Sequence, residues 1–488
     1  MLMLMDSRDT EKLREALISA DYTAAGVTAR LGEAAEAAMR RGDHRAALAA
    51  TSEGDRQAIL IRLFCCGQNE SRGAVQSAIA PLELSAAFES GLLIDGDHGI
   101  RAGLALTTYR QHWLLSDLPA HLGGHIDSEH VLGVAGASET LASYMVRRPA
   151  ATALDLGTGS GVLALHLAEQ ADAVTVTDLS QRALRFAATN AALNGVEWEI
   201  LSGDLVEPVA GRRFDRVVSN PPFITGPGAT DFTYRDSGRA GDGVCAELAA
   251  AASSLLNPGG TMQYLANWLH VADQPWKERV ASWFTDGDCD AWVIQRDVTD
   301  PLDYVRIWQR DSGADHDPAH LAAWLDWFEM QNVEAVGFGV INIRRRASGA
   351  PTVVCEDLRQ RPRTDFATLI EDWFDRVDLL ADLTPERLLD STLKLAAGVK
   401  LDQRAGFTDE GWEVERQILT DTDGLLRREE IDPLVVSFLG GCTGQAPVRT
   451  QIGLLAQAHE APEALLAAGL SPVLTGLIRR GFLDITPG

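Results

Sequence analysis

The sequence has no long apolar stretch, few cysteines and a shortage of basic residues. No run reaches the roughly eighteen apolar residues that a membrane-spanning helix needs. The start, MLMLMDSRDTEK, has no basic region of the kind that opens a signal peptide. The 6 cysteines include no CxxC pair, so we expect reduced thiols in a cytoplasmic protein. We therefore expect no membrane partner and no disulfide framework.

Acidic residues outnumber basic ones by 69 to 43, which gives a net charge of −26. Proteins that bind nucleic acid mainly by neutralising phosphates are normally basic. The composition therefore argues against an extended RNA or DNA interface, although local basic patches are compatible with it. The histidines His121, His125 and His130 lie close in sequence, but their segment is Gly-rich and has no helical i,i+4 context beyond one pair, so we expect no metal.

A chain of 488 residues is too long for one core, and its pattern changes twice. Residues 1–125 begin with Ala-rich helical spacing and continue into a hairpin around DGDHG, which suggests a helical, winged-helix-like domain. In residues 126–348, seven short apolar runs alternate with helical stretches, which predicts a doubly wound α/β domain with a parallel sheet. Residues 351–488 are expected to be mainly helical and again winged-helix-like, with a loop over 438–447 and a helix running into a strand over 470–485.

A glycine-rich turn, ALDLGTGSGVLAL, follows the first predicted strand of the α/β domain. Glycines between a strand and a helix permit a tight turn and let a ligand approach the backbone. The dinucleotide fingerprint G-x-G-x-x-G is not met, because the third glycine is Gly161 and Val162 occupies the expected place. Asp155 precedes the first glycine by two residues, and a carboxylate there suits a positively charged ligand better than a pyrophosphate.

This turn resembles the loop D/E-x-G-x-G-x-G of class I S-adenosylmethionine-dependent methyltransferases. The resemblance implies that Asp155, or a water molecule it holds, faces the methionine amino group of S-adenosyl-L-methionine. It assigns these residues to cofactor binding: Asp155, Gly157, Thr158, Gly159, Gly161, Asp178, Leu179, Asp204 and Leu205.

Two further acids stand at strand ends, and open α/β sheets bind ligands at that edge. Asp178 ends the second predicted strand, where a carboxylate can accept hydrogen bonds from two ribose hydroxyls. Asp204 follows the third strand. In the resembling family an acid in this place accepts from the adenine N6 amino group, and the next residue, here Leu205, donates its backbone N–H.

The fourth predicted strand ends in SNPPFITGP, where two prolines stiffen the chain and remove two backbone donors. The side-chain oxygen of Asn220 and the carbonyl of Pro221, held by Pro222, can orient the protons of a planar NH₂ group and relieve its delocalisation. Phe223 offers a flat face for stacking. We therefore predict that these four residues are the catalytic group. N/D-P-P-Y/F is the signature of amino-methylating enzymes in the resembling superfamily, which implies a planar amine as the acceptor, held close to the methyl donor.

The tetrapeptide NPPF, together with the glycine loop, resembles the "small" methyltransferase superfamily. That group includes ribosomal RNA guanine-N2 and adenine-N6 enzymes and release-factor glutamine-N5 methyltransferases. Residues 128–346 are similar to an actinobacterial group of these enzymes with extra terminal domains. The segment TDFTYRDSGRAGDGV resembles the loop after this motif in the glutamine enzymes, which implies substrate binding by Tyr234, Arg235 and Asp236.

Several functions remain open at this point. The leading hypothesis is N-methylation of a protein glutamine, with a release-factor-like partner, and the alternative is an RNA base. A hypothesis of another class is a nucleic-acid-binding protein whose methyltransferase fold senses the cofactor, and the intact NPPF argues against it. Small-molecule methylation ranks third and NAD-dependent oxidoreduction last. The sequence does not name the methyl acceptor, the role of the terminal domains or the oligomeric state.

Overall fold

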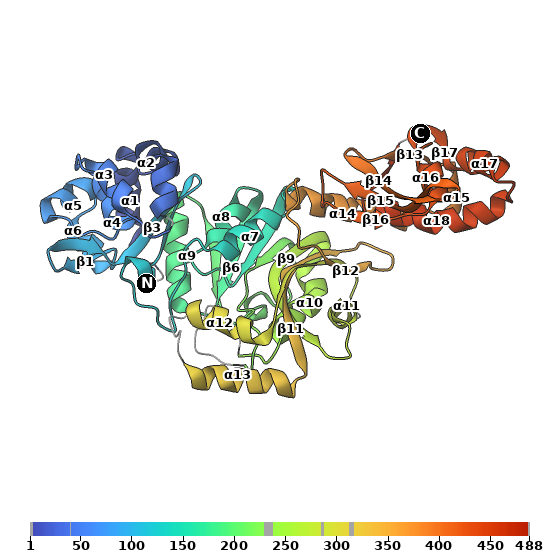
Figure 1. Ribbon diagram of the computed structural model, residues 1–488. Helices are drawn as coiled ribbons and strands as arrows, with labels where there is room; N and C mark the ends of the chain where they lie inside the picture. Colours follow the sequence, from blue (N-terminus) through green and yellow to red (C-terminus); the bar gives the residue numbers. More distant parts are fainter. Residues whose placement is uncertain (1–2, 40, 229–237, 285–286, 312–316, 487–488) are drawn as a thin grey trace. The chain divides into compact units, whose positions relative to one another are not determined.

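The computed structural model describes residues 3–39, 41–228, 238–284, 287–311 and 317–486. These residues form two compact units (Figure 1). The first contains residues 1–142, 147–347 and 353–356, and the second contains 143–146, 348–352 and 357–488. None of the helices in the described ranges is long and apolar enough to cross a membrane.

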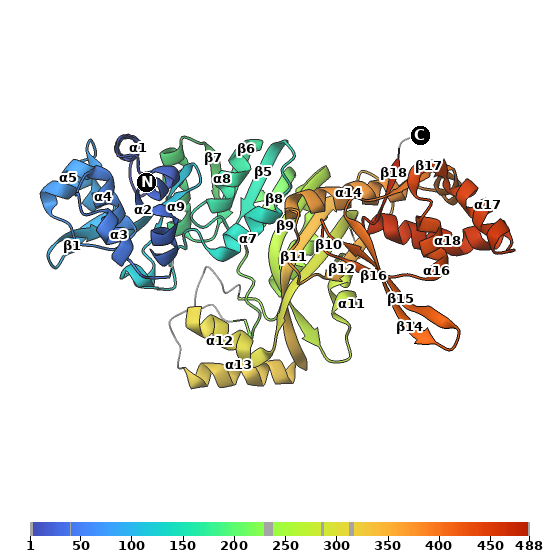
Figure 2. The same cartoon turned by 45° about the horizontal axis from the view of Figure 1, so that its top comes forward.

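The centre of the first unit is an eight-stranded sheet in the order β12-β10-β11-β9-β8-β5-β6-β7 (Figure 2). All seven predicted strands are present, and an eighth, β12, pairs at the edge beside β10. The strands span these residues: β5 Ala150–Leu156, β6 Ala171–Asp178, β7 Trp198–Ser202, β8 Phe214–Ser219, β9 Leu256–Val271, β10 Cys289–Thr299, β11 Val333–Arg345 and β12 Val353–Asp357.

Strand direction differs from the prediction on one side of the sheet. Strands β5 to β9 are parallel where they pair, as predicted, whereas β11 runs antiparallel to both β9 and β10. Two consecutive helices, α12 (Pro301–Asp311) and α13 (Pro318–Met330), join β10 to β11. Because there are two helices, β11 begins at the same end of the sheet at which β10 ends. Thr299, the last residue of β10, therefore pairs with Val336 near the start of β11.

Helices follow the strands of this sheet, and their ends are set by local sequence. Helix α9 begins after Ser180, whose Oγ accepts a hydrogen bond from the Ala183 N–H, and it ends at Gly195 with a φ of 68°. Helix α9 spans Gln181–Asn194, and the other helices of this part span these residues: α7 Gly136–Tyr144, α8 Val162–Ala168, η2 Glu207–Val209, α10 Gly243–Leu255, α11 Trp276–Ala281 and η3 Ser282–Phe284.

The described N-terminal residues form a series of helices followed by two hairpins, including the predicted hairpin around DGDHG. Their elements are α1 Ser7–Ser19, α2 Ala24–Met39, α3 Arg45–Ala50, α4 Arg56–Phe64, α5 Arg72–Ile79, α6 Leu84–Glu89, β1 Leu93–Gly96, β2 Gly99–Ala102, β3 Leu104–Tyr109, β4 His112–Asp117 and η1 Ala120–Leu122. The winged-helix assignment itself stays a prediction.

These N-terminal elements share a hydrophobic core with α9, to which Ala183, Phe186 and Leu193 contribute. Two asparagines of α9 also bond to the backbone of β4. Asn190 Oδ1 accepts from the Leu115 N–H at 2.8 Å and its Nδ2 donates to the Leu115 carbonyl at 2.9 Å, and Asn194 pairs with Trp113 in the same way. The asparagine side chains of α9 thus make the backbone hydrogen bonds with β4 that a neighbouring strand would otherwise make.

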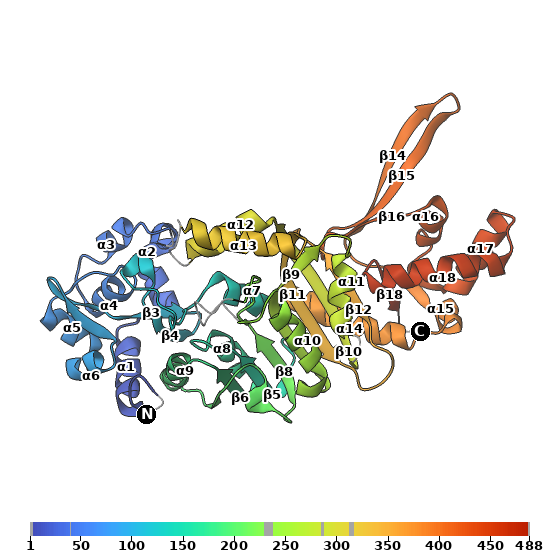
Figure 3. The same cartoon turned by 90° about the horizontal axis from the view of Figure 1, so that it is seen from below.

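The second unit contains helices α14 Phe366–Ala381, α15 Pro385–Asp390, α16 Pro433–Leu439, α17 Val448–Ala458 and α18 Glu463–Arg479. The predicted final helix and strand are α18 and β18 (Leu483–Thr486). Two three-stranded sheets add to the helices, in the orders β17-β13-β18 and β14-β15-β16 (Figure 3). Their other strands are β13 Thr392–Leu395, β14 Val399–Thr408, β15 Gly411–Asp421, β16 Arg428–Glu430 and β17 Thr443–Pro447.

The prediction of a mainly helical C-terminal region is therefore incomplete. Strands β14 and β15 are rich in charged residues, so their sequence does not show the apolar runs that identified the strands of the large sheet. The loop predicted over 438–447 is wrong in its second half, which is β17. Pro447 is tolerated there because β17 is an edge strand.

Candidate active site

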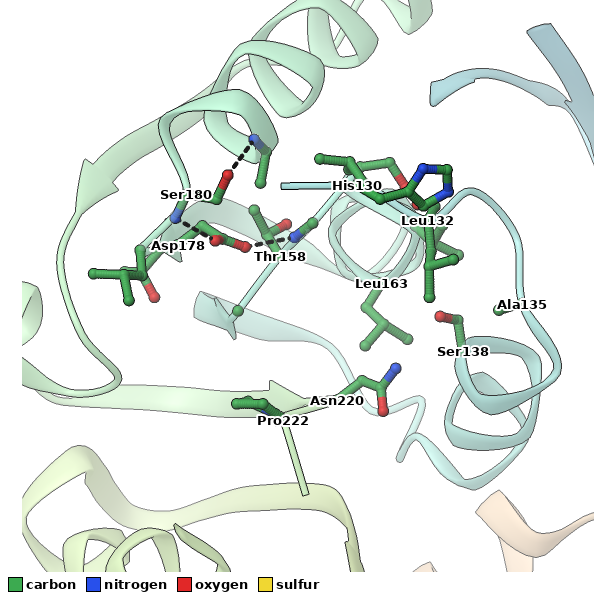
Figure 4. Close-up of a pocket in the computed structure, with 18 of the residues that line it drawn as sticks. His130, Leu132, Ala135, Ser138, Thr158, Leu163, Asp178, Ser180, Asn220 and Pro222 are labelled. Carbon is green, nitrogen blue, oxygen red and sulfur yellow. Dashed lines mark hydrogen bonds between the residues drawn. The ribbon is translucent and has the colours of Figure 1, made fainter. Parts of the chain in front are cut away.

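A cavity of about 300 Å³ lies at the carboxyl ends of strands β5, β6, β7 and β8. Several loops line it, each following one of these strands, and a further wall comes from the segment before α7 and the first turn of α7 (Figure 4). The lining residues are Glu129, His130, Val131, Leu132, Gly133, Ala135, Ala137, Ser138, Gly157, Thr158, Gly159, Ser160, Val162, Leu163, Thr177, Asp178, Leu179, Ser180, Ala183, Gly203, Asp204, Leu205, Asn220, Pro222 and Arg239.

The three glycines of the loop after β5 differ in what surrounds them. Gly157 and Gly159 have φ angles of 70° and 56°, and a Cβ built on either would meet no atom within 4 Å. At Gly161, with a φ of 90°, a Cβ would lie 2.7 Å from the Trp198 ring. Gly157 and Gly159 thus border open space that a ligand can occupy, whereas Gly161 allows the start of α8 to pack against Trp198.

Asp155 lies beneath this loop and is fully buried. Its Oδ2 accepts a hydrogen bond from the Thr158 hydroxyl at 2.7 Å, and Oδ1 has no hydrogen-bond partner among the residues that the structure describes. Burial raises the pKa of Asp155 from 3.8 to about 7, against the opposing effect of the Thr158 hydrogen bond. Thr158 lines the cavity and Asp155 does not, so Thr158 stands between this carboxyl and a ligand.

Asp178 is held at the end of β6 by backbone amides. Its Oδ2 accepts from the Gly159 N–H at 2.9 Å and its Oδ1 from the Ser180 N–H at 2.8 Å (Figure 4). Burial raises the pKa of Asp178, and these amides act in the opposite direction. Each oxygen keeps a second lone pair for a ligand hydroxyl. The neighbouring Leu179 is 60% exposed, an apolar side chain in the cavity wall with nothing packed over most of it.

Asp204 and Leu205 line the cavity after β7. Asp204 Oδ2 lies 3.0 Å from Nη2 of Arg239, which also pairs with Glu247 through its Nε at 2.6 Å. Leu205 has a φ of 42°, an uncommon value for a residue with a side chain, and it orients the backbone of this turn. Arg239 was not predicted from the sequence, because it is 35 residues from its acidic partner.

The NPPF corner follows β8, which Ser219 fixes by donating to the Leu156 carbonyl at 2.8 Å. Asn220 points into the cavity in Figure 4, and its buried Oδ1 has no hydrogen-bond partner within the described part of the chain. Pro222 also lines the cavity and Pro221 is buried. Phe223 does not line it, and packs edge-on against Trp308 with ring centroids 6.3 Å apart.

The wall formed by residues 129–138 is held from two sides. Asp117, the last residue of β4, accepts from the Val131 N–H at 2.8 Å, and the Asp117 N–H donates to the Val131 carbonyl at 3.1 Å. The Ser160 hydroxyl donates to the Leu132 carbonyl at 2.7 Å. From the sequence, this wall was not assigned to the cofactor or catalytic site, and its His130 was considered only as a possible metal ligand.

The predicted substrate-binding residues and the histidine cluster remain to be placed. Tyr234, Arg235 and Asp236 lie outside the described residues. His130 lines the cavity, but His121 and His125 do not. Among the described residues, no group of three or more His, Cys, Asp or Glu side chains could hold a metal ion. All 6 cysteines are free.

Comparison with protein families identifies the part of the chain that carries this site. Residues 132–278 match the family model described as "Methyltransferase small domain". This segment is therefore similar to the methyltransferase small domain family. It contains the glycine loop, both strand-end acids and the NPPF corner, as the motif resemblance implied. Two models described as domains of unknown function, DUF7059 and DUF7782, match residues 19–103 and 371–485.

Curated relatives match the methyltransferase domain at moderate identity. A release factor glutamine methyltransferase of Bordetella pertussis is 36% identical over 143 residues, which is 27% of this chain and 53% of that protein. One of Geobacter sulfurreducens is 34% identical over 174 residues, covering 32% and 59%. A ribosomal RNA small subunit methyltransferase C of Alcanivorax borkumensis is 36% identical over 115 residues, covering 23% and 31%. The chain thus spans about half of the length of the first two relatives.

Proposed function

We propose that this protein is an S-adenosyl-L-methionine-dependent N-methyltransferase that acts on a planar amino group. The observation that carries the proposal is Asn220, which lines the cavity and whose buried Oδ1 has no partner among the described residues. An unsatisfied buried acceptor is costly. A substrate NH₂ group would supply the missing donor.

The residues present fit the cofactor. Open space beside Gly157 and Gly159 accepts a ligand close to the backbone, and the exposed Leu179 offers an apolar surface to a flat base. Asp178 would accept from ribose hydroxyls, and Asp204 from an adenine amino group. When bound, the cofactor supplies an electrophilic methyl group on a positively charged sulfur.

At the methionine end, the Thr158 hydroxyl donates to Asp155, so its lone pairs are free to accept from an ammonium group. We therefore propose that Thr158 contacts the ammonium group directly and that the Asp155 carboxylate supplies the negative charge that attracts it. Gly161 has a structural part in this arrangement, since it allows α8 to start against Trp198.

On the acceptor side, Asn220 would orient the amine by accepting one of its protons, and the Pro221 carbonyl would accept the other. Pro222 keeps this corner rigid, so that the nucleophile is held in a near-attack position. Phe223 packs against Trp308 and does not line the cavity. We therefore propose that Phe223 supports the NPPF corner and does not stack on the substrate.

We favour a protein glutamine over an RNA base as the acceptor. The net charge of −26 disfavours an extended phosphate interface, and two of the relatives compared above are release factor glutamine methyltransferases. Because a ribosomal RNA methyltransferase is also among the relatives, an RNA base is the alternative methyl acceptor. We keep 1–125, 126–348 and 351–488 as the proposed domains, in a cytoplasmic protein that needs neither membrane nor metal.

The test is transfer of a labelled methyl group. The full-length protein is incubated with labelled cofactor and, in separate reactions, with purified release factors, ribosomes and tRNA. The proposal expects label on a side-chain amide nitrogen of a release factor, and label on an exocyclic base nitrogen would support the alternative acceptor. Label found only on oxygen or carbon, or no transfer to any of the three substrates, would refute methylation of a planar amine.

A further inference from the structure

The second unit contains a long hairpin of β14 and β15, joined by a two-residue turn at Asp409 and Glu410. In Figure 3 this hairpin extends away from the helices of the same unit. The strands pair from Val399 opposite Asp421 to Thr408 opposite Gly411. Besides β14, β15 pairs near its end with the three-residue strand β16, and among the described residues the distal half of the hairpin has no further neighbouring strand.

The two faces of the hairpin have different chemistry. Side chains alternate between faces along a strand, and the register shift between Arg404 and Ala405 places Glu415 as an extra residue in β15. From residue 401 to residue 419, the shift keeps uncharged side chains together on one face: Leu401, Gln403, Ala405, Phe407, Trp412, Val414, Gln417 and Leu419. Lys400, Asp402, Arg404, Glu413 and Arg416 lie on the other face. The bulge thus makes the hairpin amphipathic.

The uncharged face is covered at the base of the hairpin and open at its tip. Leu419 and Gln417 are buried, whereas Phe407 and Trp412 are 74% and 75% exposed. These two residues are directly opposite each other, with ring centroids 5.4 Å apart. Leu401 and Val414 on the same face are also exposed. Paired aromatic rings open to solvent are typical of binding sites, because each ring can bury a large apolar area.

The charges around the tip restrict what can cover it. Residues 405–415 include four acids, Asp409, Glu410, Glu413 and Glu415, and no basic residue. Glu415 lies 3.6 Å from Arg404, while the other three have no basic partner among the residues that the structure describes. Such a tip repels phosphates, which disfavours nucleic acid and anionic lipid. A second copy is disfavoured as well, since the chain carries a net charge of −26.

We propose that the hairpin tip, residues 405–415, docks onto a basic protein. The Phe407 and Trp412 rings would enter an apolar recess of that protein, and its lysine or arginine side chains would pair with the acids around them. This docking is independent of methyl transfer, because it uses residues outside the methyltransferase domain. It gives the C-terminal region a binding partner of defined chemistry.

Site-specific photo-crosslinking tests this proposal. Trp412 is replaced by p-benzoylphenylalanine in the full-length protein, in cells of the organism that encodes it, and the cross-linked product is identified. Leu454 on α17 of the same unit is 63% exposed, so the same replacement there is the matched control. We expect a protein product that is specific to position 412, with a cross-linked region rich in lysine and arginine.

The identified protein is then purified and its affinity for the full-length chain is measured at two salt concentrations. We expect the F407S/W412S variant to weaken binding by at least about tenfold, and D409K/E410K to weaken it and reduce its salt dependence. Unchanged melting temperatures would show that these exposed substitutions leave the fold intact. Cross-links to RNA, lipid, an acidic protein or a second copy would overturn the proposal. So would products shared with position 454, or affinities that the variants leave unchanged.

Discussion

The hydroxyl of Thr158 donates to Asp155 Oδ2 at 2.7 Å, and this bond joins a fully buried carboxyl to the lining of the cavity. Burial raises the pKa of Asp155 from 3.8 to about 7. The pKa of this carboxyl thus lies well above its ordinary value, because burial disfavours the charged form. A positively charged ligand next to Thr158 would favour the ionised form.

Cofactor affinity is expected to depend on pH through Asp155. Binding of a cation favours the carboxylate, so affinity should rise by about eightfold between pH 6 and pH 7.5 and a proton should be released. Isothermal titration calorimetry in buffers of different ionisation enthalpy measures both quantities. The Asp155→Asn variant should bind more weakly and lose this pH dependence. The same slope in the variant would contradict a role for Asp155.

The same pKa shift affects folding stability, with a sign that can be checked. Between pH 3.8 and about 7 the carboxyl is protonated in the folded state and ionised in the unfolded state. The contribution of Asp155 to the free energy of unfolding therefore falls as pH rises through this window. Chemical denaturation across the window should show a smaller decrease in Asp155→Asn than in the wild type. An identical pH profile for both proteins would refute this assignment.

Substitutions of two loop glycines should separate ligand binding from folding. Both have positive φ, so each alanine costs about 1 kcal/mol of strain. At Gly157 the new methyl enters open space, and we expect cofactor affinity to fall tenfold or more with a small loss of stability. At Gly161 it meets the Trp198 ring, so the melting temperature should fall further. Equal melting temperatures for both variants would contradict this distinction.

Asp117 is expected to act on the site as a positioning residue. It bonds to Val131 in the cavity wall, and its Oδ2 also accepts from Arg182 Nε on α9 at 2.9 Å. Asp117→Asn should weaken cofactor binding several-fold, because the wall loses its anchor, while Asp117→Glu should recover part of it. Asp43→Asn is the control, since Asp43 pairs with Arg45 at the surface. Equal cofactor affinities in the Asn variant and the wild type would refute this role.

The sequence predicted the site best where a residue type at a given place in the fold has one typical chemical role. The glycines, the acids at strand ends and the NPPF corner could be placed at one sheet edge because parallel strands end there together. Arg239 and the wall over 129–138 could not be predicted, since their contacts are distant in sequence and their side chains have many uses. The hairpin of β14 and β15 was missed because its charged face breaks up the apolar pattern that marks a buried strand.

The central claim is that Asn220 orients a planar amine for methylation, and one comparison tests it most directly. The rate of methyl transfer to the substrate labelled by the wild type is measured for Asn220→Ala, together with its cofactor affinity. We predict a rate at least about a hundredfold lower, with cofactor affinity within about twofold of the wild type. Transfer at the wild-type rate, or label on an oxygen or carbon atom, would contradict the account.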